Sequence, residues 1–154
     1  MEINTSYFGP VQVDPAKIIY FPDGIWGFDD HKEFLVLDVP EKRYKCLQSV
    51  KEEYVSFIIV NPWDYYDDYE FEMSDDEFGK IGAKKTEQLA VFNILTIRET
   101  LERTTVNLLA PLVINVDEKK GRQMVLNESR YTTRMPLFPE GQVKEEEAPH
   151  ADTD

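Results

Sequence analysis

Short runs of β-branched and aromatic residues recur along most of the chain. They are separated by Gly, Pro, Asn and Asp, and this spacing is typical of an all-β domain. The pattern predicts strands over residues 18–21, 34–37, 44–50, 55–60, 69–73, 89–97, 106–116 and 123–127. With 154 residues, 42% of them apolar, the chain can bury one real core, so we expect one domain.

Three features refine the strand pattern. Residues 89–97 are apolar at both alternating sets of positions, which predicts a central strand covered on both faces. Pro111 cannot donate to a sheet ladder, so residues 106–116 must contain an edge, a bulge or a break there. Residues 117–121 read as a hairpin loop in which Gly121 supplies the positive φ, and the surrounding topology should therefore be antiparallel.

One short helix and one tail complete the predicted organisation. Ser74 followed by Glu77 fits a capping box, and Gly79 and Gly82 should keep the helix short. After Pro139 the composition leaves almost nothing apolar to bury, so we expect residues 140–154 to be a disordered acidic tail. The folded domain would then span residues 1–139.

The net charge of −13 is concentrated in two places. The stretch 64–77 has eight acidic residues and no Lys or Arg, and the stretch 140–154 has six acidic residues and one Lys. The remaining 16 acidic and 16 basic residues cancel. The excess negative charge thus lies in these two stretches, and the rest of the chain is electrically neutral.

Most catalytic and metal chemistries find no support in these residues. A nitrogen or sulfur metal site needs three or four ligands, whereas the chain offers His31, His150 and Cys46. Cys46 lies within a strand pattern and reads as a buried small hydrophobe, and His31 lies in a loop without a visible partner. We therefore expect no enzyme activity, no catalytic residue, no metal and no cofactor.

Location and partner class follow from charge and hydropathy. A single cysteine excludes an intramolecular disulfide, and the first residues lack the regions of a signal peptide, which indicates a reducing cytoplasm. No apolar run approaches the roughly 20 residues that cross a bilayer. An acidic surface repels nucleic acid, so any link to RNA should run through a basic protein.

Aromatic residues interleave with acids between Trp63 and Phe71, and two interpretations are open. The aromatics could fill the core beneath an ordinary solvated face. They could also anchor a partner protein whose approach the acids steer.

Five ordered segments carry a resemblance that favours the second interpretation. They are residues 21–28 (FPDGIWGF), 47–50 (LQSV), 57–62 (FIIVNP), 107–115 (NLLAPLVIN) and 131–137 (YTTRMPL). In this order and at these separations they resemble the flagellar assembly factor family FliW, from Tyr7 to Pro139. The acidic tail lies outside the match.

The resemblance implies a compact β-barrel-like, non-enzymatic regulator. Proteins of this family bind the dimeric RNA-binding regulator CsrA and stop it repressing translation of flagellin messenger RNA, and flagellin competes for them. The implied partners of this chain, which we expect to be a monomer, are therefore CsrA and flagellin. The candidate contact residues are Asn61, Pro62, Tyr69, Glu70, Phe71, Asn107, Leu108 and Pro111.

Two rival functions remain at this stage. A small aromatic-rich barrel could be an enzyme that binds a ligand or a flavin. A secretion chaperone that binds flagellin alone would lack affinity for CsrA. The sequence leaves open the strand order, the stoichiometry with CsrA, the flagellin segment that is recognised, whether the two partners share one surface, and the role of the tail.

Overall fold

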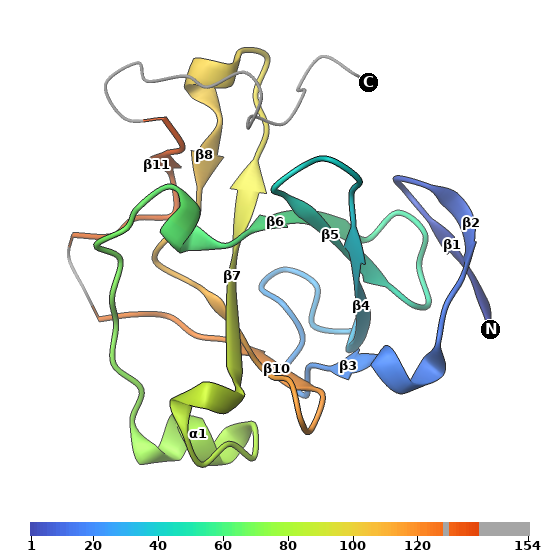
Figure 1. The fold of residues 1–154 in the computed structure, drawn as a ribbon, viewed down its shortest axis with the longest axis horizontal. Coiled ribbons are helices and arrows are strands. Elements are labelled where there is room, and N and C mark those ends of the chain that lie inside the picture. The colour runs from blue at the N-terminus through green and yellow to red at the C-terminus, as the bar shows by residue number, and fades with distance from the viewer. Residues whose placement is uncertain (128–129, 139–154) are drawn as a thin grey trace.

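The computed structural model describes residues 1–127 and 130–138, and within them the chain is mainly β-structure (Figure 1). Residue 139 and the predicted tail, residues 140–154, lie outside the described residues. The strands are β1 (Glu2–Thr5), β2 (Gly9–Gln12), β3 (Ile19–Tyr20), β4 (Glu33–Asp38), β5 (Lys45–Ser49), β6 (Ser56–Val60), β7 (Leu89–Thr96), β8 (Thr105–Val106), β9 (Leu112–Asn115), β10 (Lys120–Gln123) and β11 (Met135–Pro136). The helix is α1 (Asp75–Lys80), and four 3-10 turns are η1 (Pro15–Lys17), η2 (Pro62–Asp64), η3 (Thr86–Gln88) and η4 (Leu101–Arg103).

Seven of these strands close into a mixed barrel. They follow the order β7-β6-β5-β4-β3-β10-β9, and β9 pairs back onto β7. The pairing of β10 with β3 is parallel, and the other barrel pairings are antiparallel. β8 continues along the edge of β7 beyond β9, and β11 adds to β8. The expectation of a mainly antiparallel, barrel-like domain with one short helix is confirmed.

The two faces of the barrel wall bury separate apolar clusters. In β9, Leu112 and Ile114 point into one cluster and Val113 into the other, as the period of two in a strand requires. The inner cluster fills the barrel and contains Ile19, Phe21, Ile25, Phe34, Leu47, Val55, Ile59, Leu112 and Ile114. The interior is therefore packed with side chains.

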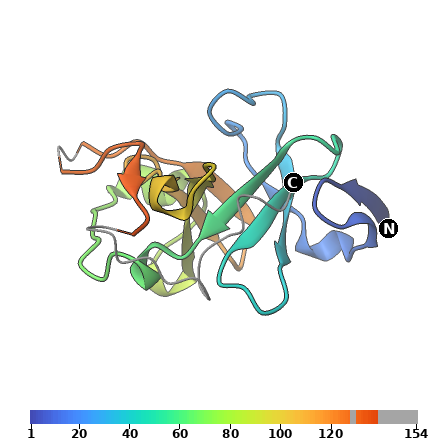
Figure 2. The same cartoon turned by 90° about the horizontal axis from the view of Figure 1, so that it is seen from above.

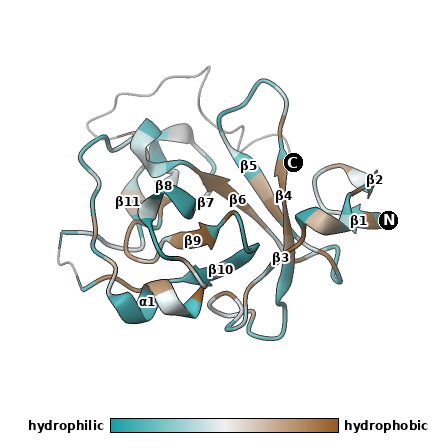
Figure 3. Ribbon diagram, turned by 60° about the horizontal axis from the view of Figure 1, so that its bottom comes forward, coloured by the Kyte–Doolittle hydropathy of each residue, from teal (hydrophilic) through white to brown (hydrophobic). Residues whose placement is uncertain are grey.

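The outer cluster is covered mainly by chain outside the barrel strands. Two stretches, residues 61–88 and the described residues 124–127 and 130–138, lie over the outside of β6, β7 and β9. Figure 2 shows them at the end away from the hairpin β1–β2. Leu89, Val91 and Leu95 of β7 pack beneath them, while Phe92 and Ile94 face the barrel interior. The apolar colouring of β6 and β9 in Figure 3 reflects the same double burial. These contacts explain why residues 89–97, which contain β7, have the pattern of a strand covered on both faces.

Four details differ from the prediction. No strand forms over residues 69–73. The second strand of the hairpin β9–β10 lies at Lys120–Gln123 and not at 123–127. The hairpin β1–β2 was not predicted. The segment 106–116 breaks at residues 107–111 into β8 and β9, one of the outcomes expected from Pro111. The positive φ of the hairpin loop belongs to Lys119, at 56°, and not to Gly121. Gly121 is needed for space, because a Cβ there would lie 2.6 Å from the Phe21 ring.

Candidate functional site

Two segments that the sequence singled out, residues 61–71 and 107–111, meet around the side chain of Tyr69. Its buried hydroxyl donates a hydrogen bond to the carbonyl oxygen of Leu108 at 2.7 Å. The amide nitrogen of Asn93, in β7, donates to the Tyr69 hydroxyl at 3.3 Å and to the carbonyl oxygen of Asn107 at 2.7 Å. These bonds join both segments to the barrel wall.

The loop before Tyr69 is built by local hydrogen bonds. The Asn61 side chain accepts from the backbone nitrogen of Trp63 at 2.9 Å and so caps η2, in which Pro62 is the first residue. The indole nitrogen of Trp63 donates to the carbonyl oxygen of Tyr69 at 2.7 Å. This bond closes the loop, and Trp63 nevertheless remains 40% exposed.

Aromatic rings surround Tyr69, which is buried. The ring centroids of Tyr131, Phe71 and Trp63 lie 4.8, 5.6 and 5.8 Å from that of Tyr69. The Tyr131 hydroxyl in turn accepts from the backbone nitrogen of Glu70 at 3.1 Å. Burial raises the pKa of Tyr69 to about 12, so the hydroxyl keeps its proton and remains a donor at neutral pH.

A groove of about 540 Å³ opens beside these rings, and we call it the acid-rimmed groove. It lies between residues 63–73, helix α1 and strand β7. Its apolar walls are Trp63, Phe71, Met73, Phe78, Leu89 and Val91, and Glu70 and Glu72 stand exposed on its rim. A mainly apolar depression with a few charged groups is the form that protein and peptide anchors occupy.

The acidic stretch 64–77 supplies the negative charge of the rim. Three of its eight acids form ion pairs: Asp64 with Arg43, Asp76 with Lys80 and Glu77 with Arg122. The other five, which make no ion pair within residues 1–127 and 130–138, are Asp67, Asp68, Glu70, Glu72 and Asp75. Their charge is therefore available to a basic partner.

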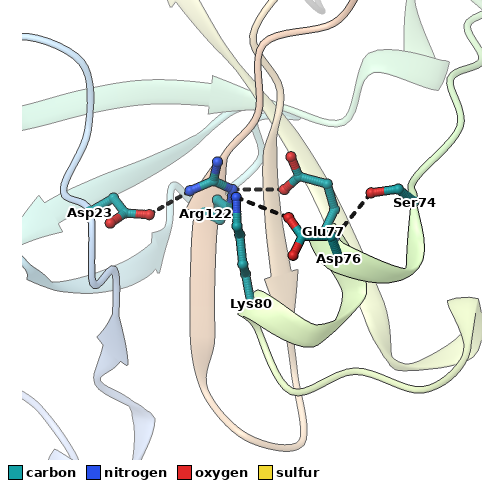
Figure 4. A network of polar contacts seen from close by, with 6 residues as sticks. All are labelled: Asp23, Ser74, Asp76, Glu77, Lys80 and Arg122. Atoms are coloured by element: carbon teal, nitrogen blue, oxygen red, sulfur yellow. Dashed lines mark hydrogen bonds and ion pairs between the residues drawn. The ribbon is translucent and has the colours of Figure 1, made fainter.

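Arg122 of β10 fixes helix α1 against the barrel (Figure 4). Its guanidinium donates to the carboxylates of Asp23 and of Glu77, the latter at 2.7 Å. Ser74 caps the helix by accepting from the backbone nitrogen of Glu77 at 3.2 Å, as the capping pattern predicted. Because Phe78 of α1 lines the acid-rimmed groove, these contacts also hold one wall of the groove.

The candidate contact residues occupy three kinds of position. Asn61 and Glu70 are exposed, Phe71 and Asn107 are half-buried, and four are buried: Pro62, Tyr69, Leu108 and Pro111. The Asn107 side chain accepts from the backbone nitrogen of Ala110 at 3.0 Å and shapes its own loop. The buried residues can influence a partner only by supporting the surface above them.

The sequence interpretation missed several groove walls, because they come from other elements. Met73, Leu89 and Val91 were seen only as strand residues, and Phe78 was passed over. One signal was available, since Phe78 is the single large apolar residue in the charged helix Asp75–Lys80.

Cys46 and the metal-ligating residue types were the other candidates for reactive chemistry. Cys46 is buried in β5, and burial raises the pKa of its thiol to about 11, which confirms its interpretation as a small hydrophobe. Among the described residues, no three His, Cys, Asp or Glu side chains gather where they could hold a metal ion. None of the helices found there has the length and apolar character to cross a membrane.

Comparison with known proteins identifies relatives over most of the chain. The family described as "FliW protein" matches residues 2–137. The flagellar assembly factor FliW of Oceanobacillus iheyensis is 38% identical over 138 residues, covering 89% of this chain and 94% of that protein. The counterpart in Anoxybacillus flavithermus is 36% identical over 140 residues, covering 91% and 97%.

The fold agrees with a solved structure of the same kind. A crystal structure titled as that of the flagellar assembly factor FliW superposes with a TM-score of 0.87 at 33% identity. The match covers 92% of this chain and 99% of that one. The alternative of a ligand-binding or flavin-binding barrel enzyme is therefore excluded by family, because this chain belongs to the FliW family of flagellar assembly factors, which is not an enzyme family.

Proposed function

We propose that this protein binds the dimeric regulator CsrA in the cytoplasm and relieves its repression of flagellin messenger RNA translation. It acts as a monomer, and flagellin is the competing partner that withdraws it from CsrA. The observation that carries this proposal is the acid-rimmed groove, where apolar walls lie beside the carboxylates of Glu70 and Glu72, which form no ion pair with the described residues.

Charge supports a basic partner. A protein that binds RNA must present Lys and Arg to the phosphates. The unpaired carboxylates Asp67, Asp68, Glu70 and Glu72 are complementary to such a surface and would speed its encounter with this protein. Once docked, the same carboxylates would repel RNA, so they need not occupy the RNA-binding site itself.

Packing supports a specific contact. Trp63 is held in place by its bond to Tyr69 and still exposes much of its ring. Rigid, partly exposed aromatics next to an apolar groove are the residues that most often dominate binding energy. Asn61 and Glu70, the two exposed candidates, stand at either end of the same loop.

Co-purification tests the proposal directly. Purified protein is mixed with CsrA, with flagellin, or with both, and the complexes are separated by size. The proposal expects a complex with each partner alone, and displacement of CsrA by excess flagellin. A complex with flagellin and none with CsrA would favour the secretion chaperone instead.

The role of charge has its own experiment. Neutralising four rim and loop acids (Asp67→Asn, Asp68→Asn, Glu70→Gln and Glu72→Gln) should weaken CsrA binding and reduce release of flagellin messenger RNA from CsrA at low salt. If both affinity and RNA release stay at the wild-type level, the electrostatic mechanism is wrong.

A further inference from the structure

The segment Phe71–Met73 has backbone groups without hydrogen-bond partners in the described residues. The preceding residue, Glu70, donates its N–H to the Tyr131 hydroxyl at 3.1 Å. The next main-chain bond begins at Ser74, whose carbonyl oxygen accepts from Phe78 at 3.0 Å. Between them, neither the N–H groups nor the carbonyls of Phe71, Glu72 and Met73 are paired within residues 1–127 and 130–138.

The same segment has the side-chain pattern of a strand. Glu70 and Glu72 are exposed, whereas Phe71 and Met73 are half-buried against the outer cluster. A period of two is what an extended chain produces. The strand predicted over residues 69–73 is thus strand-like in pattern and lacks only a partner strand.

Both sides of the segment are open. On one side lies the acid-rimmed groove, and on the other a second hollow of about 340 Å³ that Phe71 and Glu72 share with residues 124–127. Figure 1 shows the connection from η2 down to α1 as an extended segment outside the sheet. A paired strand lies roughly 4.8 Å from its neighbour, so an added strand would lie directly beside this segment.

We propose that Phe71–Met73 is a docking edge that binds an extended segment of a partner protein by β-strand addition. The incoming segment hydrogen-bonds the free main-chain groups and inserts apolar side chains into the acid-rimmed groove. Its Lys or Arg residues lie opposite Glu70 and Glu72, whose carboxylates form no ion pair with the part of the chain that the structure describes. The mode of recognition goes beyond the proposed function but rests on it for the partner, CsrA.

The direction of the backbone groups selects the groove side. In an extended chain the N–H groups of successive residues point to opposite edges. Because the Glu70 N–H points to Tyr131, the Glu72 N–H shares that edge. The N–H groups of Phe71 and Met73 then face the opposite edge. Residues 124–127 line the second hollow and Tyr131 follows them in the chain, so we assign the opposite edge to the acid-rimmed groove.

Residue-resolved amide hydrogen exchange of the full chain tests this assignment. The amides of Phe71 and Met73 should exchange quickly in the free protein, and roughly tenfold or more slowly when CsrA is saturating. The Glu72 amide should change less. Binding detected by calorimetry without protection of these two amides overturns the docking edge and leaves the proposed function standing. No binding of CsrA at all overturns both.

A matched pair of variants provides a second test. Met73→Pro removes the N–H, and it costs no internal hydrogen bond because that group is unpaired. Met73→Ala keeps the N–H and likewise removes the long side chain from the groove wall, so the comparison of the two variants reports on the N–H. We expect Met73→Pro to bind CsrA about tenfold more weakly than Met73→Ala. Equal affinity of two folded variants contradicts the proposal, and amide exchange of the wild type decides if Met73→Pro does not fold.

Discussion

The hydroxyl of Tyr69 donates to the carbonyl oxygen of Leu108 at 2.7 Å, and this bond connects the two segments that hold the candidate contact residues, 61–71 and 107–111. The carbonyl of Leu108 belongs to the loop between β8 and β9, which leaves the sheet at this point. Asn93 completes the connection from the barrel wall. A tyrosine that looks like a contact residue in the sequence is therefore the buried support of the surface that carries Trp63 and Glu70.

Tyr69→Phe tests that support. The substitution keeps the ring and removes the hydroxyl, so that the Leu108 carbonyl loses its donor and the Asn93 amide loses one acceptor. Leaving a buried polar group unpaired costs about 1–3 kcal/mol, and the free energy of unfolding measured in urea should fall by that amount. A loss below about 0.5 kcal/mol would mean that the bond does not hold the segments together.

The stability difference between wild type and Tyr69→Phe should depend on pH. Burial raises the pKa of Tyr69 to about 12, whereas an unfolded tyrosine has a pKa of about 10. The unfolded state therefore releases this proton first, and the wild type loses stability as pH rises from about 10 to 12. Urea unfolding across this pH range should show the free energies of unfolding of the two proteins converging. A difference that stays constant with pH would contradict the raised pKa of Tyr69.

Gly121→Ala should destabilise the barrel. Its Cβ would meet the ring of Phe21, whose side chain is fully buried in the inner cluster, at 2.6 Å. Overpacking of this kind costs about 1–3 kcal/mol, and thermal denaturation should show the lowered midpoint. Gly79→Ala is the control, because no atom lies within 4 Å of its Cβ and alanine favours the helix. Equal midpoints of thermal denaturation for the two variants would be inconsistent with this packing.

Arg122→Met should loosen helix α1. The Arg122 side chain is 22% exposed and its guanidinium pairs with both Asp23 and Glu77, so its loss should cost about 1 kcal/mol or more. Lys80→Met removes only the exposed pair with Asp76 and should cost about 0.3–0.5 kcal/mol. Chemical denaturation at low and high salt measures the free energy of unfolding that each variant loses relative to wild type. A larger effect of Lys80→Met would contradict the role given to Arg122.

The strand-rich pattern predicted most of the barrel, because strands such as β4 to β6 are joined by short connections and show their burial in their own residues. The closure of the sheet into a barrel could not be predicted in the same way. It depends on β9 returning to β7 and on a parallel contact in which Lys120 is paired with Tyr20. Contacts between distant, short segments leave no local periodicity to detect.

The candidate site was predictable only in part. Residues 69–73 alternate like a strand, but whether a strand finds a partner depends on the rest of the fold. Likewise, Leu108 and Pro111 stand in the strongest family-like segment and are buried, since a recurring motif reflects packing as readily as contact. Locating the unpaired carboxylates required the positions of Arg43, Lys80 and Arg122.

The central claim is that CsrA binds at the acid-rimmed groove, and calorimetric titration of CsrA into a charge-reversed protein tests it most directly. Glu70→Lys with Glu72→Lys changes the rim, while Asp29→Lys with Asp30→Lys makes the same change of charge at exposed positions between β3 and β4. We predict that the first variant binds CsrA at least about tenfold more weakly at low salt, and that the second stays within about threefold of wild type. Equal affinities of the two folded variants would contradict the account.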